Sequence, residues 1–160
     1  GLGGFSFGNV DANTTALIVG ANVYINATGY FVGNGTVNTF IDSSTIKLTS
    51  GAYTTFSVNT VGLPVQVVDS FISTSYRGGQ YTITVKDGTV GANAHQISQL
   101  LIAHVTDTAY VTEYGIITTN TSVGTLGVFS ATTNATHVIL NFTPSVANTV
   151  IKGSRTLITV

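Results

Sequence analysis

The sequence predicts an all-β protein, and its composition carries most of this prediction. Thr supplies 28 of the 160 residues, Gly 18 and Asn 12. Thr is β-branched and suits a pleated strand, whereas Gly and Asn favour tight turns. Residues that favour helices are scarce, with one Glu, five Lys and Arg together, and no Met. Short apolar runs between Gly- and Asn-containing turns are typical of strands rather than helices.

The low charge of the chain excludes some classes of function. Charged side chains make up 7% of the residues and the net charge is −1, so we expect no nucleic acid partner. The mean hydropathy is +0.40, but no apolar run approaches the ~20 residues of a spanning helix, so we expect no membrane insertion. The absence of Cys and Met excludes disulfides and fits an extracellular protein. Because the chain begins at Gly1 without Met, we expect it to be a processed or partial product.

Residues 1–63 form the first of two predicted domains, a Gly/Asn/Thr-rich segment of short strands. Turns such as the one at Gly33–Gly35 separate its apolar pieces, and the stretch 23–32 aligns with 39–48 at a shift of 16 residues. Such short strands in one chain bury too little surface to offset the entropy of ordering them. We therefore expect this repetitive segment to stack on, or intertwine with, other copies of the chain.

Residues 64–160 form the second predicted domain, with about seven antiparallel strands. This number and spacing are typical of a β-sandwich or a jelly-roll-like domain. Strands over 71–76 and 80–86 are predicted to form a hairpin around Arg77–Gly79, because Gly pairs mark turns.

A further hairpin is predicted over residues 96–119, with Asp107-Thr108 as its two-residue loop. This loop would pair His104 with Val111 and divide the side chains between two faces. The uncharged face is predicted to be the core side; it contains Leu101, Ala103, Val105, Tyr110, Thr112, Tyr114 and Ile116. The other face is apolar enough to suggest an interface; it contains Leu100, Ile102, His104, Ala109, Val111 and Glu113.

Five residues are candidates for a surface-binding or interface role, namely Tyr76, Arg77, Tyr81, His104 and Glu113. An Arg between two Tyr side chains could bind a glycan or stack on a neighbouring subunit, although a turn with flanking aromatics accounts for the same cluster. His104 and Glu113 could meet diagonally across their hairpin as an acid–base pair. No nucleophile motif accompanies them, which favours a structural role.

We predict no catalytic, cofactor-binding or metal-binding residues. His95, His104 and His137 lack the spacing of metal ligands. The six acidic residues are scattered, and no phosphate-binding, dinucleotide-binding or nucleophile-elbow motif is present. The sequence therefore predicts a protein that is not an enzyme and has no cofactor.

Several stretches resemble one family of virion proteins. The stretch VGNGTVNTFI at 32–41 is similar to Val-Gly-Asn-x-Thr-Val-Asn-Thr-x-Ile segments repeated in tail-fibre-like proteins of tailed marine phages, especially those that infect cyanobacteria. The stretches SYRGGQYTITVKDGT, LLIAHVTDTAYVTEYGIITTN and FTPSVANTVIKGSRTLI resemble the β-rich C-terminal module of the same proteins. The resemblance covers roughly residues 20–48 and 71–158. It implies a virion appendage protein, commonly trimeric in fibres, with no enzymatic residues to carry over.

The predicted function is therefore a structural subunit of a phage virion appendage, such as a tail or neck fibre. Its expected partners are copies of itself, other virion proteins and a host-surface glycan that its loops contact. Two alternatives remain open: a carbohydrate- or receptor-binding module, and a subunit of a cellular surface filament that donates a strand to the next copy. A polysaccharide hydrolase ranks last, because the six acidic residues are scattered along the sequence. It stays among the alternatives because two separated carboxylates can converge in the fold.

Overall fold

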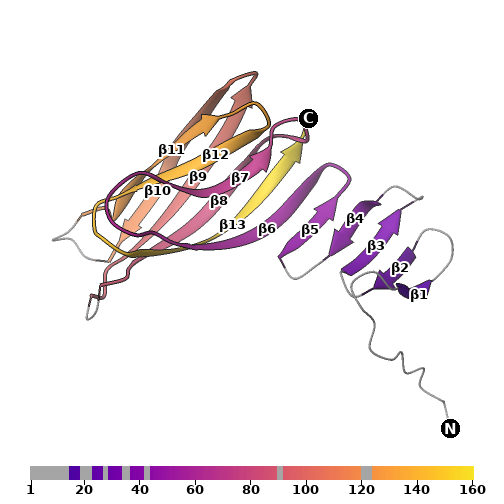
Figure 1. The fold of residues 1–160 in the computed structure, drawn as a ribbon, viewed down its shortest axis with the longest axis horizontal. Coiled ribbons are helices and arrows are strands. Elements are labelled where there is room, and N and C mark those ends of the chain that lie inside the picture. The colour runs from indigo at the N-terminus through magenta and orange to yellow at the C-terminus, as the bar shows by residue number, and fades with distance from the viewer. Residues whose placement is uncertain are drawn as a thin grey trace, which may run out of the picture. The chain divides into compact units, whose positions relative to one another are not determined.

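The computed structural model describes most of the chain, and the regular elements in its described part are all β-strands (Figure 1). The described residues are 15–18, 23–26, 29–33, 37–41, 44–89, 92–119 and 124–160. This confirms the all-β prediction. No helix among these residues is long and apolar enough to cross a membrane.

The chain divides into two compact units, Gly1–Thr49 and Ser50–Val160. This division differs from the predicted boundary at 63/64. The reason is strand β6 (Gly51–Asn59), which pairs along its length with β13 (Thr149–Thr159) near the end of the chain. Strand β6 therefore belongs to the second unit, although its composition resembles that of the first.

The described residues of the first unit form five short strands, and consecutive strands among these five pair antiparallel. They are β1 (Thr15–Ile18), β2 (Val23–Asn26), β3 (Gly29–Gly33), β4 (Val37–Ile41) and β5 (Thr45–Leu48). Strands β2 and β3 pair Ile25 with Tyr30, and β4 and β5 pair Ile41 with Ile46, each residue 16 positions later. The two hairpins thus share one register at the period of the sequence repeat.

The second unit is a sandwich of two antiparallel sheets, as the sequence predicts. One sheet has the order β6-β13-β8-β9-β10 and the other β11-β12-β7. The remaining strands are β7 (Gln66–Ile72), β8 (Tyr76–Asp87), β9 (His95–Val105), β10 (Thr108–Thr118), β11 (Gly127–Thr133) and β12 (His137–Pro144).

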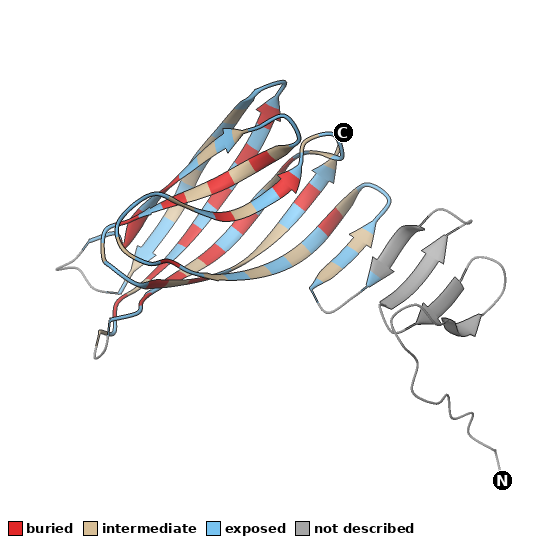
Figure 2. Ribbon diagram, in the orientation of Figure 1, coloured by how far each residue is buried: buried red, intermediate tan, exposed pale blue. Residues whose placement is uncertain are grey.

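The core of the sandwich lies between these two sheets. Buried residues alternate with exposed ones along the central strands (Figure 2), which is the pattern of a sheet with one buried face. The five-stranded sheet contributes Tyr81, Ile83, Val85, Leu100, Ile102, Ile151 and Leu157, and the three-stranded sheet contributes Val68, Phe71, Phe129, Val138, Leu140 and Phe142.

The predicted hairpin around Arg77–Gly79 is wrong. Strand β8 runs without a break through these residues, and the turn before it lies at 73–75. Strands β7 and β8 belong to different sheets, so this turn carries the chain from one layer to the other. Gly78 and Gly79 have another role, because a Cβ at either position would collide with a backbone oxygen of the adjacent strand.

The predicted β9–β10 hairpin exists, but its register and its buried face differ from the prediction. The loop is Thr106-Asp107, with Thr106 in the left-handed region at φ 49°, so His104 pairs with Ala109 instead of Val111. The observed register differs from the predicted one by two residues, and because side chains alternate with a period of two, each face keeps the residues predicted for it. The buried face is nevertheless the one with His104, while the face that contains Leu101 and Tyr110 is exposed.

Candidate functional site

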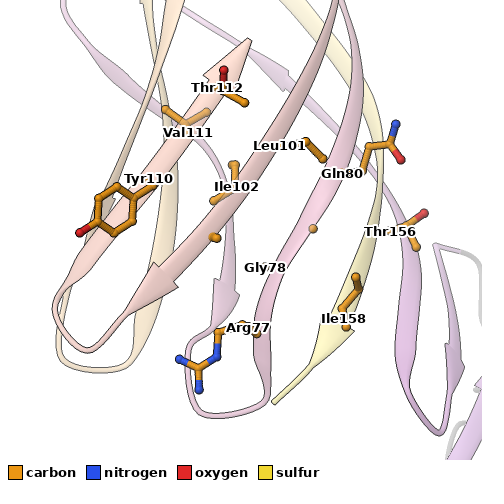
Figure 3. Close-up of a pocket in the computed structure, with 12 residues that line it drawn as sticks. Arg77, Gly78, Gln80, Leu101, Ile102, Tyr110, Val111, Thr112, Thr156 and Ile158 are labelled. Carbon is orange, nitrogen blue, oxygen red and sulfur yellow. The ribbon is translucent and has the colours of Figure 1, made fainter. Parts of the chain in front are cut away.

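The outer face of the five-stranded sheet has an open groove near the β9–β10 loop. Its volume is about 580 Å³. Figure 3 shows residues that line it. The strand register places Ile158, Gly78, Ala103 and Tyr110 side by side on four adjacent strands. Gly78 has no side chain and Ala103 has only a methyl group, so these two form the floor between the larger Ile158 and Tyr110.

Polar groups lie at the margins of this groove. Arg77 lines the groove and donates a hydrogen bond from Nη1 to the carbonyl oxygen of His104, at 3.3 Å. Gln80, two residues after Gly78 along β8, donates a hydrogen bond from Nε2 to the hydroxyl of Tyr114 at 2.6 Å. An apolar depression with a few polar groups at its edge can hold an apolar or aromatic group of a partner molecule.

The groove is part of a larger apolar patch on the same face. We define the apolar patch as seven residues that are each 42–66% exposed, namely Ile97, Leu101, Val105, Tyr110, Tyr114, Ile117 and Ile158. Six of them lie on β9 and β10. Soluble monomers rarely expose so many large apolar side chains on one face.

Strand β10 is the last strand of its sheet and lies close to β11 of the other sheet. Two further features limit pairing of its edge with a strand of another molecule. A β-bulge interrupts its register between Glu113 and Gly115. The side chain of Glu113 is partly buried on the inner face, with its Oε1 atom unpaired within the described part of the chain. Bulges and inward-pointing charges are devices that oppose edge-to-edge association.

Replacing Glu113 by Val is expected to stabilise the fold and to make the protein prone to aggregation. Removing a buried, unpaired carboxylate oxygen recovers about 1–3 kcal/mol of desolvation free energy, while loss of the inward charge frees the β10 edge. Thermal unfolding and light scattering at increasing concentration measure the two effects. Glu113→Gln is the matched control, and a Val variant that is less stable than wild type would contradict this role for Glu113.

Of the five predicted site residues, the structure brings together Tyr76, Arg77 and His104. Their contacts hold β8 and β9 together and do not form a binding surface. The Nε2 atom of His104 donates to the carbonyl oxygen of Tyr76 at 2.9 Å, and Arg77 contacts the backbone of His104. His104 is buried against Phe71, with ring centroids 6.5 Å apart. A surface-binding role for His104 is therefore wrong, whereas Arg77 is exposed in the groove.

Tyr81 is also not a surface residue, because it is fully buried in the core. It lies near an ion pair between Asp69 of β7 and Arg155 of β13, which joins the two sheets. Arg155 also donates from Nη1 to the carbonyl oxygen of Ser70 at 2.8 Å. Burial raises the pKa of Asp69, an effect that the charge of Arg155 opposes. Burial, together with the Asp69 carboxylate, raises the pKa of Tyr81, so its hydroxyl stays protonated.

The predicted His104–Glu113 acid–base pair does not form. Glu113 pairs with Leu100, which is four residues from His104 along β9. This separates the two backbone positions by roughly 13 Å. Within the described ranges, no group of three or more His, Asp or Glu side chains is placed to hold a metal ion.

Sequence reasoning missed both the groove and the buried Asp69–Arg155 pair. The groove depends on residues of β8, β9, β10 and β13 that meet only when the register is known. The pair has one weak signal: Asp69 is the single charge of β7, whose other residues are mostly apolar or small. Arg155 gives no such signal, because β13 also carries Lys152.

Comparisons with known proteins find similarity only among solved structures. No protein-family model matches the chain, and a search of curated proteins gives no match. One similar structure is the tailspike protein of Acinetobacter phage vB_ApiP_P1, with a TM-score of 0.45 and 16% identity over 68% of this chain and 22% of that chain. Another is the tailspike of Acinetobacter baumannii phage AM24, with a TM-score of 0.37 and 11% identity over 68% of this chain and 26% of that one.

A third similar structure is the tailspike protein gp49 of Acinetobacter baumannii phage Fri1, described as a capsular polysaccharide depolymerase. Its TM-score is 0.43, with 18% identity over 81% of this chain and 24% of that chain. The chain thus spans about a quarter of the length of these tailspikes.

Proposed function

We propose that this chain is a structural module of a phage tail appendage that assembles with copies of itself through the apolar patch. The sequence resemblance of residues 20–48 and 71–158 to tail-fibre-like virion proteins supports the virion location. The exposed apolar patch on β9, β10 and β13 is the observation that carries the assembly. We propose a trimer, the form that the resemblance implies, and no catalytic activity.

The size of the patch fits a stable interface between subunits. Large side chains such as Tyr present about 150–250 Å² when fully exposed, and roughly half of each of the seven is accessible. The patch therefore offers on the order of 700 Å², close to the ~800 Å² that each partner buries in a standard interface. None of the seven side chains is charged, so burying them carries no penalty for desolvating an ion.

The form of strand β10 favours assembly by packing of faces over pairing of edges. The bulge after Glu113 and the inward orientation of its carboxylate oppose addition of a strand at this edge. In contrast, the outer face carries no such protection over Leu101 and Tyr110. This difference favours a fibre-like assembly over a filament whose subunits donate strands.

Substituting Leu101→Glu and Tyr110→Glu together is expected to convert the assembly into monomers. Each Glu would place a charge in the buried interface, and we expect association to weaken by about a hundredfold or more. Size-exclusion chromatography with multi-angle light scattering at micromolar concentration measures the state directly, since a monomer is 16.5 kDa. Circular dichroism checks that the variant keeps its strands.

The matched control is the variant Ser130→Glu/Thr143→Glu, which adds two charges at exposed positions of the three-stranded sheet. It should assemble as wild type does. A wild-type chain that is a stable monomer at micromolar concentration, or a Leu101/Tyr110 variant that still assembles, would overturn the proposed interface.

The second candidate function is binding of a carbohydrate on the host surface. The observation that favours it is the remaining part of the outer face, over β6, β13 and β8, which is rich in hydroxyl groups and carries two Lys side chains.

A further inference from the structure

A polar hollow lies on the outer face of the five-stranded sheet, beside the apolar patch. Its volume is about 640 Å³. Two adjacent rows of side chains across β6, β13 and β8 line it, and the strand register fixes both rows. The rows are Ser57–Lys152–Thr84 and Thr55–Ser154–Thr82, and we call these six residues the polar hollow.

The hollow arises because small hydroxyl side chains stand between larger neighbours. In the register, the row that contains Tyr53 and Gln80 borders it on one side, and the row that contains Lys86 borders it on the other. Tyr53 is 44% exposed and offers an apolar ring surface at this border. Five hydroxyl groups, each a donor and an acceptor, thus lie between an aromatic ring and a Lys side chain.

The part of the outer face that contains the polar hollow carries, among the described residues, positive side chains and no acidic ones. Lys86 and Lys152 are exposed on neighbouring strands of the outer face, in diagonal positions about 7–8 Å apart. In the described part of this unit, Asp69 and Glu113 lie on inner faces and Asp87 is buried at a turn.

The remaining acid of the described part, Asp107, lies in the β9–β10 loop at the opposite end of the sheet. The His95 end of β9, which pairs with Lys86, is about 30 Å from that loop. This distance exceeds the ~8 Å screening length at physiological salt, so Asp107 does not offset the positive charge of the hollow.

Hydroxyl groups, a ring surface and two ammonium groups together define the chemistry of a ligand. Sugar hydroxyls would hydrogen-bond to the Thr and Ser side chains, a pyranose ring would pack on Tyr53, and anionic groups would pair with Lys86 and Lys152. Two Lys side chains are few for a nucleic acid, whose affinity comes from many phosphate contacts. We infer that the polar hollow binds a polysaccharide that carries carboxylate groups. This inference rests on the carbohydrate-binding candidate function and not on the assembly through the apolar patch.

The test compares binding of polygalacturonate, an acidic polysaccharide, by the full 160-residue chain and its variants in titration calorimetry. The variant Lys86→Gln/Lys152→Gln removes both cations and is expected to weaken binding about tenfold. The variant Thr82→Val/Thr84→Val keeps side-chain shape and strand preference but removes two hydroxyls, and is expected to weaken binding about three- to fivefold. Lys47→Gln, which removes one positive charge from β5 in the first unit, is the control and should leave binding unchanged.

Two further probes decide the class of ligand. Dextran, a neutral polysaccharide, should bind at least about tenfold more weakly than polygalacturonate, because it offers no partner for the ammonium groups. A single-stranded oligonucleotide should bind weakly, and the Thr variant should not change that binding. Absence of polygalacturonate binding, binding that the Lys variant leaves unchanged, or an oligonucleotide affinity equal to that for polygalacturonate would each overturn the inference. Multi-angle light scattering on the same samples reports assembly separately. The carbohydrate-binding proposal and the assembly proposal can therefore fail independently.

Discussion

Replacing Arg155 by Met is expected to lower the free energy of unfolding by about 3–5 kcal/mol, the usual cost of leaving a buried charge without its partner. The side chains of Arg155 and Asp69 are only 11% and 10% exposed, and the pair joins the two sheets of the sandwich. Arg155 also donates to the carbonyl oxygen of Ser70, which would lose this donor as well. Urea unfolding followed by circular dichroism measures the loss.

The stability of the Arg155→Met variant should depend on pH in a direction that follows from the pKa of Asp69. Burial raises that pKa above its ordinary value of 3.8, and Arg155 is the main opposing influence. Without Arg155 the pKa rises further, so the folded variant binds a proton more tightly than the unfolded chain does. Its stability relative to wild type should therefore be greatest at acidic pH and fall as the pH rises through the folded-state pKa of Asp69.

The double variant Asp69→Leu/Arg155→Met is the control for this prediction. It removes both charges and fills their space with apolar atoms, so it should recover most of the lost stability. It should also lose the additional pH dependence. If the double variant is as unstable as Arg155→Met, the cost comes from lost packing and not from the uncompensated carboxylate.

Replacing Phe142 by Ala is expected to cost about 3–5 kcal/mol through the cavity it leaves. Phe142 is fully buried in β12 and packs against Phe129, with ring centroids 4.7 Å apart. Gly127 on β11 leaves room for this ring, because a Cβ there would collide with it. The protein has no Trp, so thermal unfolding by circular dichroism is the suitable measurement.

Val128→Ala is the matched control for the Phe142 prediction. Val128 lies on the neighbouring strand but is 59% exposed on the outer side. Its truncation should change the stability by about 0.5 kcal/mol or less. Equal losses for the two variants would mean that the two-sheet core does not depend on Phe142.

Much of the sandwich could be predicted because its strands alternate clearly between apolar and polar residues. In β8, Ile83 and Val85 face the core while Thr82 faces outward, as their alternation indicates. The alternation could not show that Gly78 and Gly79 lie inside a strand, since a Gly pair is equally typical of a turn. The close backbone approach that requires them comes from β9 and β13, which lie far away in the sequence.

The buried face of the β9–β10 hairpin could not be predicted because both of its faces are apolar. The prediction placed the face with His104 and Glu113 outside, since charged and ionisable groups usually contact water. In the structure, buried His104 donates a hydrogen bond to the carbonyl oxygen of Tyr76. Glu113 lies on the inner face of the edge strand β10. The hydrogen bond of His104 and the position of Glu113 on an edge strand therefore allow this face to be buried, although it carries more ionisable groups than the other face.

The candidate site could likewise be predicted only in part from the sequence. Arg77 could be selected from the sequence because a cation between aromatic residues is rare in a chain of such low charge. The groove beside it could not, because its floor depends on Gly78 facing Ala103 and on Ile158 from the last strand. The polar hollow likewise depends on β6 and β8 lying on either side of β13, an order that no local pattern predicts.

The shared register of the β2–β3 and β4–β5 hairpins has a consequence for how such a segment can change in length. Adding or deleting one 16-residue unit would preserve the register within each remaining hairpin, because the pairs of β2 with β3 and of β4 with β5 recur 16 residues apart. A change by an odd number of residues would instead turn the following strand over, and its apolar side chains would point to the opposite face. Duplication or deletion of whole hairpins is therefore the change in length that best keeps the pairing inside each hairpin.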